Sequence, residues 1–298
     1  MEYRQLGKST LHISRIGFGA MSLRPLENNV QDLLFSAIDK GINFFDTADL
    51  YDKGLNETAL GQALKGKRQD IILATKVGNQ WRQDGSGWDW NPRKAYILKA
   101  AEESLKRLQT DYIDLYQLHG GTIDDPIDEA IEAFEELQKA GKILYYGISS
   151  IRPNVIREYV QRSHITSVMM QYSLLDRRPE ESCLQLLLDH QIGVLARGTV
   201  AGGLLVNKPA VDYLGHPAAA IAGVQEMIGT VAGVHSNGAE TAIQFALKHP
   251  AITAAIVGIR TPQQLQDAIQ SIGKPALTAK ELLILQEAAP ALLYKDHR

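Results

Sequence analysis

An eightfold alternation of two kinds of segment constrains the fold of this chain more than any other feature. Short apolar runs alternate with longer segments in which apolar residues recur every three or four positions, the spacings of strands and of amphipathic helices. The runs that we predict to be strands are Ile16 to Met21, Asn43 to Thr47, Ile71 to Val77, Tyr112 to His119, Ile143 to Ser149, Val168 to Tyr172, Gly193 to Ala196 and Ala254 to Gly258. The segments that we predict to be helices are Val30 to Lys40, Glu57 to Lys65, Ala95 to Leu108, Asp128 to Ala140, Asn154 to Gln161, Glu180 to His190, Ala239 to Lys248 and Pro262 to Ile272.

Strands that are each followed by a helix, repeated eight times, predict a closed parallel (β/α)8 barrel, a TIM barrel of the α/β class. A run such as Ile71 to Ala74 is apolar on both faces, as expected of parallel strands that are covered on both sides. The alternative is an open doubly wound sheet, which favours Gly-x-Gly-x-x-Gly after the first strand. The segment Gly17 to Ser22 lacks the third glycine. We therefore predict a barrel, formed as one domain over residues 1–298.

Several segments fall outside the eightfold pattern. Glu2 to Ile16 alternates around a Gly-Lys-Ser turn, which predicts a β-hairpin that caps one end of the barrel. Asn79 to Arg93 contains all three tryptophans, and Thr199 to Ser236 is rich in Ala and Gly without a strong period. We expect both to be extended loops at the C-terminal face of the barrel, where active sites of this fold are built, with the tryptophans acting as a wall or lid. After the eighth helix we predict a C-terminal helical extension.

Charge and cysteine content exclude several classes of function. The formal net charge is 31 − 34 = −3 with no basic block, so we expect no nucleic-acid partner. The single cysteine, Cys183, cannot form an internal disulfide, which favours a reducing compartment. The N-terminus lacks the apolar core of a signal peptide, and the longest apolar run, Ala251 to Ile259, is far too short to span a membrane. We therefore expect a cytoplasmic protein without membrane association; the sequence leaves its oligomeric state open.

Ionisable residues interrupt the ends of three consecutive predicted strands. Asp46 ends the second strand, Lys76 the third and His119 the fourth, and Tyr51 follows Asp46 closely. Consecutive strands of a barrel are neighbours, so these four side chains can converge at the C-terminal face. Each one alone could be a solvated strand end or a packing residue. Their convergence predicts a catalytic site.

The chemistry of the four side chains favours protonation of a carbonyl oxygen. A buried lysine requires a carboxylate partner, and Asp46 is the one available to Lys76. A phenol, with an ordinary pKa of about 10, donates a proton poorly unless a cation stabilises the phenolate, and Lys76 can supply that cation to Tyr51. His119 can orient the carbonyl oxygen or assist the proton transfer. Because no protein side chain delivers hydride, a nicotinamide or flavin is implied, and no metal is needed.

Over nearly its whole length the sequence resembles the aldo-keto reductases, in particular bacterial-type NADPH-dependent members. The stretches that carry the resemblance are Phe44 to Ala48 with Tyr51, Ala74 to Val77, Asp111 to His119, and Gly147 to Ser149. The resemblance implies a (β/α)8 barrel that reduces aldehydes or ketones with NADPH, using Asp46, Tyr51, Lys76 and His119 as its tetrad. It also implies that Ser149 and Gln171 hold the nicotinamide amide. Ser150 stands where the family usually has Asn, a departure that affects one amide contact.

The segment after the eighth predicted strand suggests a phosphate site. Thr261 as N-cap, Pro262 at the first helical position and Gln264 three residues after the cap predict a capping box. A helix N-terminus next to Arg260 is an anion site, although Arg260 could also be an ordinary surface arginine. The resemblance implies that Gly258, Arg260 and Gln264 contact NADPH, with Arg260 at the 2′-phosphate. Ala268 replaces the usual adenine-facing Asn, which predicts weaker adenine binding.

After the seventh predicted strand the chain has Arg197 and Gly198, where many relatives place an aromatic residue against the nicotinamide. A guanidinium is planar and can stack as well, so we expect both residues to contact the cofactor; a pairing of Arg197 with a carboxylate on the rim is the alternative.

The sequence thus predicts an NADPH/NADP+-dependent reductase of a small carbonyl substrate. Two other hypotheses stay open. One is a redox-sensing partner protein that binds NADPH, like the auxiliary subunits of potassium channels; the other is a barrel isomerase or lyase that uses Arg260 to hold a substrate phosphate.

Overall fold

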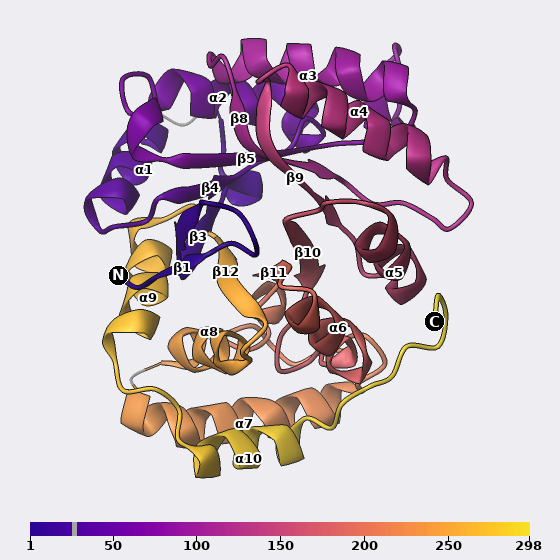
Figure 1. Ribbon diagram of the computed structural model, residues 1–298. Helices are drawn as coiled ribbons and strands as arrows, with labels where there is room; N and C mark the ends of the chain where they lie inside the picture. The colour runs from indigo at the N-terminus through magenta and orange to yellow at the C-terminus, as the bar shows by residue number, and fades with distance from the viewer. Residues whose placement is uncertain (26–28, 236) are drawn as a thin grey trace.

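A closed barrel of parallel strands forms the centre of the protein. The computed structural model describes residues 1–25, 29–235 and 237–298 (Figure 1). The barrel strands are β3 (Ile16–Gly19), β4 (Phe44–Asp46), β5 (Ile72–Val77), β8 (Ile113–Leu118), β9 (Ile143–Ser149), β10 (Ser167–Gln171), β11 (Gly193–Arg197) and β12 (Ile252–Gly258). They pair in chain order, and β12 pairs with β3 to close the barrel. The predicted (β/α)8 fold is confirmed.

Helices surround the barrel (Figure 1). Those that follow the strands are α1 (Val30–Asp39), α2 (Leu55–Ala63), α3 (Lys94–Leu108), α4 (Ile127–Lys139), α5 (Pro153–Arg162), α6 (Cys183–Asp189), α8 (Gly238–Lys248) and α9 (Pro262–Gly273). Their apolar faces pack on the outside of the sheet. In α4, for example, the ring of Phe134 lies 5.6 Å from that of Tyr116 on β8 and 5.4 Å from that of Tyr146 on β9, measured between centroids. This cover explains why the strands are apolar on both faces.

The interior of the barrel is filled by alternate residues of each strand. Phe44, Leu115, Met169 and Leu195 belong to one buried apolar cluster, separate from the larger cluster between sheet and helices. Residues two positions further along the same strands have side chains on the same face, at the carboxyl ends of the strands. The inner face therefore changes from apolar in the middle of the barrel to polar at its C-terminal mouth.

The predicted N-terminal hairpin is present and covers the opposite end of the barrel. Strands β1 (Tyr3–Gln5) and β2 (His12–Ser14) pair antiparallel, and Leu6 and Ile13 join the cluster inside the barrel. The turn residue Gly7 has a φ of +56°, and a Cβ there would lie 2.4 Å from the carbonyl oxygen of Thr166. Only glycine allows this backbone to approach the starts of β10 and β11 so closely.

The two segments predicted as extended loops contain secondary structure. Residues 79–93 include a short hairpin of β6 (Asn79–Trp81) and β7 (Trp88–Trp90). The expectation of a loop over Thr199 to Ser236 was wrong for its second half, which forms α7 (Ala218–His235); Ser236 lies outside the described residues. Alanine favours helix, but the apolar residues of α7 are not confined to one face, so the sequence showed no strong helical period.

The C-terminal extension is helical, as predicted. Helix α10 (Ala279–Ala288) begins with a capping box between Thr278 and Glu281 and lies beside α7 (Figure 1). Within the three described ranges, no helix combines the length and apolar character needed to cross a bilayer.

Candidate active site

A buried lysine joins the ends of β4 and β5. Lys76, only 1% exposed, directs its Nζ into the mouth of the barrel, 2.7 Å from Oδ2 of Asp46 and 2.7 Å from the carbonyl oxygen of Thr47. The same Nζ lies 3.4 Å from the hydroxyl of Tyr51. The structure thus brings together three of the residues that the strand-end pattern singled out.

Tyr51 lies at the start of a strained turn. It opens the short 3-10 segment η2 (Tyr51–Gly54), in which Asp52, Lys53 and Gly54 have φ values of 49°, 55° and 85°. Two consecutive non-glycine residues in the left-handed region are unfavourable on their own, so tertiary contacts must hold this conformation. The Tyr51 amide donates to the carbonyl oxygen of Ala48 at 3.2 Å.

His119 completes the group from the neighbouring strand. It directly follows β8, and its amide donates to the carbonyl oxygen of Val77 at 2.7 Å. Its ring meets the ring of Tyr51 edge-on, with the centroids 5.9 Å apart. Burial, together with the positive charges of Lys76 and Arg197, lowers the pKa of His119 to about 3. His119 is therefore a neutral imidazole near pH 7, able to donate or accept a hydrogen bond but not charged.

The Lys76–Asp46 pair fixes a positive charge beside Tyr51. Burial alone would lower the pKa of Lys76, but the attraction of Asp46 and Tyr51 holds it above its ordinary value, so the side chain stays an ammonium. Burial raises the pKa of Asp46, and the nearby ammonium opposes that rise. The second carboxylate oxygen of Asp46 has no hydrogen-bond partner within the described residues, and neither has Nδ1 of His119.

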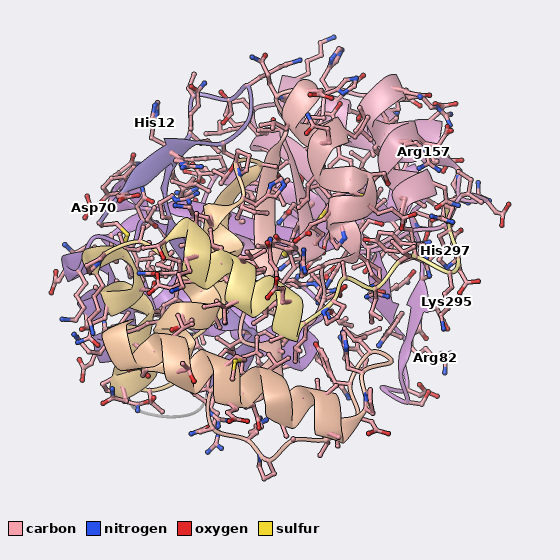
Figure 2. All side chains as sticks on the ribbon, turned by 90° about the horizontal axis from the view of Figure 1, so that it is seen from below. His12, Asp70, Arg82, Arg157, Lys295 and His297 are labelled. Carbon is pink, nitrogen blue, oxygen red and sulfur yellow. The ribbon has the colours of Figure 1, made fainter. Side chains whose placement is uncertain are left out.

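The tryptophan-bearing hairpin stands beside the Tyr51 turn. The indole Nε1 of Trp81 donates to the carbonyl oxygen of Leu50 at 3.1 Å, and Nζ of Lys53 lies 5.1 Å from the centroid of the Trp81 ring. Trp90 donates to the carboxylate of Asp125 in the loop after β8. Arg82, on the same hairpin, lies at the edge of the molecule in Figure 2. These contacts support the expectation that the segment is a wall of the site.

The remaining strand ends form the other side of the mouth. Ser149, Gln171 and Arg197 end β9, β10 and β11. Nη1 of Arg197 donates to Oε1 of Gln171 at 3.2 Å, and Nε2 of Gln171 donates to the hydroxyl of Tyr213 at 3.0 Å. Arg197 is close enough to the first side of the mouth for its charge to act on the pKa of both Asp46 and His119. Tyr213 lies in a segment without a clear pattern, so this contact could not be predicted from the sequence.

Two small residues follow on the same side. Ser150 is buried, and its hydroxyl accepts from the amide of Arg152 at 3.2 Å. Gly198 has a φ of +71°, and a Cβ there would lie 3.4 Å from the Gln171 side chain, so the backbone passes directly over that amide.

The start of α9 has the features of an anion site. Thr261 caps the helix by accepting from the amide of Gln264 at 3.2 Å, as predicted. The Gln264 side chain, however, accepts from the amide of Arg260 at 3.0 Å and not from that of the cap residue, so the predicted reciprocal capping box is wrong in this half. The Arg260 side chain is exposed. Gly258 is exposed, and a Cβ there would lie 2.6 Å from the hydroxyl of Ser22, so glycine allows the end of β12 to approach Ser22 closely.

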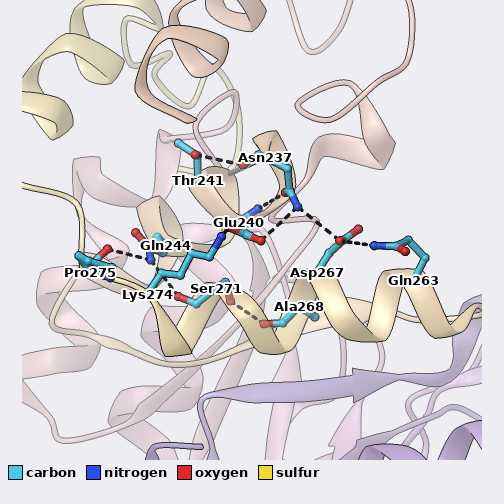
Figure 3. Close-up of polar contacts among 10 residues, drawn as sticks. All are labelled: Asn237, Glu240, Thr241, Gln244, Gln263, Asp267, Ala268, Ser271, Lys274 and Pro275. Atoms are coloured by element: carbon cyan, nitrogen blue, oxygen red, sulfur yellow. Dashed lines mark hydrogen bonds and ion pairs between the residues drawn. The ribbon is translucent and has the colours of Figure 1, made fainter. Parts of the chain in front are cut away.

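Further along α9, Ala268 is fully buried and its carbonyl oxygen accepts from the Ser271 hydroxyl at 2.6 Å. Polar groups of α8 and its cap residue meet polar groups of α9 and its C-terminal end here (Figure 3). Nδ2 of Asn237 lies 3.2 Å from Oε1 of Glu240 and 3.3 Å from Oδ1 of Asp267, which also accepts from Gln263 at 2.9 Å. Glu240, itself fully buried, pairs with Lys274 at 3.1 Å.

The carboxylate of Asp46, the ammonium of Lys76, the hydroxyl of Tyr51 and the neutral imidazole of His119 thus lie together at the C-terminal mouth of a (β/α)8 barrel. The family model "Aldo/keto reductase family" matches residues 15–290. This chain belongs to the aldo/keto reductase family.

Two similar proteins cover the whole chain. It is 50% identical to the uncharacterized oxidoreductase YqkF of Bacillus subtilis, over 100% of both chains. It is 51% identical to the aldo-keto reductase AKR11C1 of Bacillus halodurans, solved in a holo form, with a TM-score of 0.95 over 100% of this chain and 99% of that one. It is also 34% identical to "Aldo-keto reductase yakc [NADP(+)]" of Schizosaccharomyces pombe, over 68% of this chain and 62% of that protein.

Proposed function

We propose that this aldo-keto reductase uses NADPH to reduce the carbonyl group of a small aldehyde or ketone, with Tyr51 as the proton donor. The observation that carries the proposal is the contact of one buried ammonium, Lys76, with both Asp46 and the Tyr51 hydroxyl. An ammonium beside a phenol stabilises the phenolate that remains after the proton has left.

The residues on the second side of the mouth fit NADPH. An exposed arginine beside a capped helix N-terminus suits a phosphate, and Gly258 at the end of β12 is exposed as well. We propose Arg260, with Gln264, as the contacts to the 2′-phosphate. The NADP(+) in the name of the Schizosaccharomyces pombe relative supports this cofactor, and the holo form of the similar Bacillus halodurans enzyme supports the binding of a cofactor.

Nearer the tetrad, small and amide-bearing side chains suit the nicotinamide end. We propose that Ser149, Ser150 and Gln171 hold its amide and that Arg197 and Gly198 lie against its ring. Gln171 is already oriented by Arg197 on one side and Tyr213 on the other. When bound, NADPH supplies the hydride; the protein supplies the proton and the geometry.

Each member of the tetrad then has a distinct role. Tyr51 donates its proton to the carbonyl oxygen. Lys76 stabilises the resulting phenolate, and Asp46 holds the ammonium in place. His119, neutral because of its low pKa, orients the carbonyl oxygen by a hydrogen bond and does not compete as an acid.

The test is a panel of aldehydes, ketones and quinones assayed by the decay of NADPH absorbance. We expect turnover with at least one class of carbonyl. Tight NADPH binding without turnover on any of them would contradict the proposal and favour the redox-sensing partner protein. Absence of NADPH binding, seen in nicotinamide fluorescence, would contradict both and favour the isomerase or lyase.

A further inference from the structure

We propose that Asn56 and Glu57, in the first turn of α2, form a clamp that sets the Tyr51 hydroxyl against Lys76, and that both are positioning residues for the proton transfer. This inference rests on the proposed function, because it concerns the placement of the proposed acid. It follows from a set of buried hydrogen bonds on the outer face of the barrel, behind the tetrad.

The first element of the clamp is a pair of threonines. Thr47 and Thr75 are each one residue away from a tetrad member, so their side chains point to the opposite face of the sheet. The Thr47 hydroxyl donates to Oδ1 of Asn56 at 2.7 Å, and the Thr75 hydroxyl donates to Oε1 of Glu57 at 2.6 Å. Two consecutive residues of α2 therefore bind the two strands that carry Asp46 and Lys76.

The clamp also reaches the elements on either side. Nδ2 of Asn56 donates to the carbonyl oxygen of Ala20, which follows β3, at 2.9 Å. The other carboxylate oxygen of Glu57 accepts from Nε of Arg107 at 2.6 Å and from the Ser104 hydroxyl at 3.3 Å, both on α3. Asn56 and Glu57 thus tie α2 to three successive strand ends and to the next helix.

Because the hydrogen bonds of the clamp are buried, they restrict where α2 can lie. All four side chains of the clamp, those of Thr47, Asn56, Glu57 and Thr75, have an exposure of 0%. Water cannot replace a lost partner without entering the packed layer between sheet and helix, so an alternative placement of α2 would leave buried polar groups unpaired. The position of α2 relative to β4 and β5 is therefore narrowly defined.

Tyr51 depends on that position because only the left-handed turn separates it from the clamp. Residues 52–54 all have positive φ, a conformation that persists only when both of its ends are held. On the near end, the amide of Asp49 donates to the carbonyl oxygen of Lys76 at 3.3 Å. On the far end, the clamp holds α2.

The contact between Tyr51 and Lys76 would be lost on a small displacement of either side chain. The Tyr51 hydroxyl is 3.4 Å from Nζ of Lys76, at the upper limit for a hydrogen bond. A small displacement of the turn would remove the ammonium from the phenol, while leaving the cofactor side of the mouth as it is. The inference therefore predicts a loss of turnover that is separate from any loss of cofactor affinity.

The test is the double variant Thr47→Val, Thr75→Val, which removes both hydroxyls at nearly constant volume. We expect kcat to fall by about tenfold or more, the Kd for NADPH to stay within about twofold, and the alkaline limb of the kcat–pH profile to shift. Thr47→Ser, Thr75→Ser keeps the hydroxyls and should recover most of kcat. Thr253→Val, a buried threonine on β12 away from α2, is the matched control for the loss of a buried hydroxyl.

An unchanged kcat and pH profile in the valine double variant would overturn the inference. So would a fall in kcat that merely follows Tm and NADPH affinity, as in the control, or one that the serine variant fails to recover. If the double variant does not fold, Thr75→Val alone is measured against the same criteria. Wild-type turnover in the same assay is the reference: its absence would overturn the proposed function, whereas an active wild type with an unaffected double variant would overturn only the clamp.

Discussion

The two sides of the barrel mouth differ in how far their polar side chains are buried and in contact with one another. On the side of β4, β5 and β8, buried groups contact one another directly: Lys76 contacts Asp46, Thr47 and Tyr51, and the strands behind them are bound to α2. On the side of β9 to β12, the polar groups lie along a rim that ends in the exposed side chain of Arg260.

We relate this difference to two proposed tasks, proton donation and cofactor binding. A proton donor must be held within a few tenths of an ångström, which requires buried contacts made before any ligand arrives. A cofactor that enters and leaves is better served by a rim whose arginine and helix N-terminus are exposed. We therefore expect substitutions on the first side to affect turnover and stability, and those on the second side to affect binding.

Among the substitutions that test this difference between the two sides of the mouth, we expect Lys76→Met to have the largest effect. Turnover should be abolished, because the phenolate of Tyr51 loses its cation. The free energy of unfolding should fall by about 3 to 5 kcal/mol, because Asp46 is left buried without a partner. Urea unfolding and NADPH-decay assays measure the two losses. The variant Asp46→Asn, Lys76→Met is the control: it should regain stability without activity, and a fully active Lys76→Met would show that the lysine is only a strand end.

A smaller effect, confined to binding, is expected for Arg260→Ala on the rim. A charge-assisted contact to a phosphate contributes roughly 1.5 to 3 kcal/mol, so the Kd for NADPH should rise about ten- to a hundredfold. The Kd for NADH should change little and kcat at saturation should be nearly constant. The effect should shrink as salt increases. Fluorescence titration with both cofactors tests this, and an equal loss of affinity for each would mean that Arg260 supports the fold or the shared pyrophosphate.

A further effect, seen only in the pH dependence of stability, is expected at Asp49, which is buried behind the Tyr51 turn. Burial and the nearby charge of Glu57 raise the pKa of Asp49 to about 8. Because the folded state binds this proton more tightly than the unfolded chain, the contribution of Asp49 to stability declines as pH rises from about 4 to about 8. Asp49→Asn should remove that decline and be relatively more stable at pH 8 to 9.

Urea unfolding of wild type and Asp49→Asn at several pH values gives the comparison. Asp70→Asn, at an exposed aspartate, controls for the change in net charge. Parallel pH dependences of stability for wild type and Asp49→Asn would contradict the assignment.

Much of this arrangement was predictable from the sequence, for identifiable reasons. The barrel followed from the periodicity, and the proximity of Asp46, Lys76 and His119 followed from the rule that carboxyl ends of neighbouring parallel strands meet. Both rest on regular elements, where position along the chain determines position in space.

The clamp and the second side of the mouth were harder to predict from the sequence. The contacts of Asn56 and Glu57 depend on a left-handed turn that places α2 behind the strands, and no periodic pattern specifies that turn. Helix α7 was missed because its apolar residues are not confined to one face, and Tyr213 lies in the segment before it. The low pKa of His119 follows from burial between two cations, which only the packed structure reveals.

The central claim is that the first side of the mouth supplies the proton through Tyr51, and Tyr51→Phe tests it most directly. Stopped-flow single turnovers at saturating NADPH, together with fluorescence titration of NADPH, separate chemistry from binding. Tyr145→Phe, which loses a hydroxyl bonded to Thr10 of the N-terminal hairpin, is the matched control. We predict that Tyr51→Phe lowers the single-turnover rate by orders of magnitude, leaves the Kd for NADPH nearly intact, and that Tyr145→Phe does neither; a rate retained within about twofold in Tyr51→Phe would contradict the account.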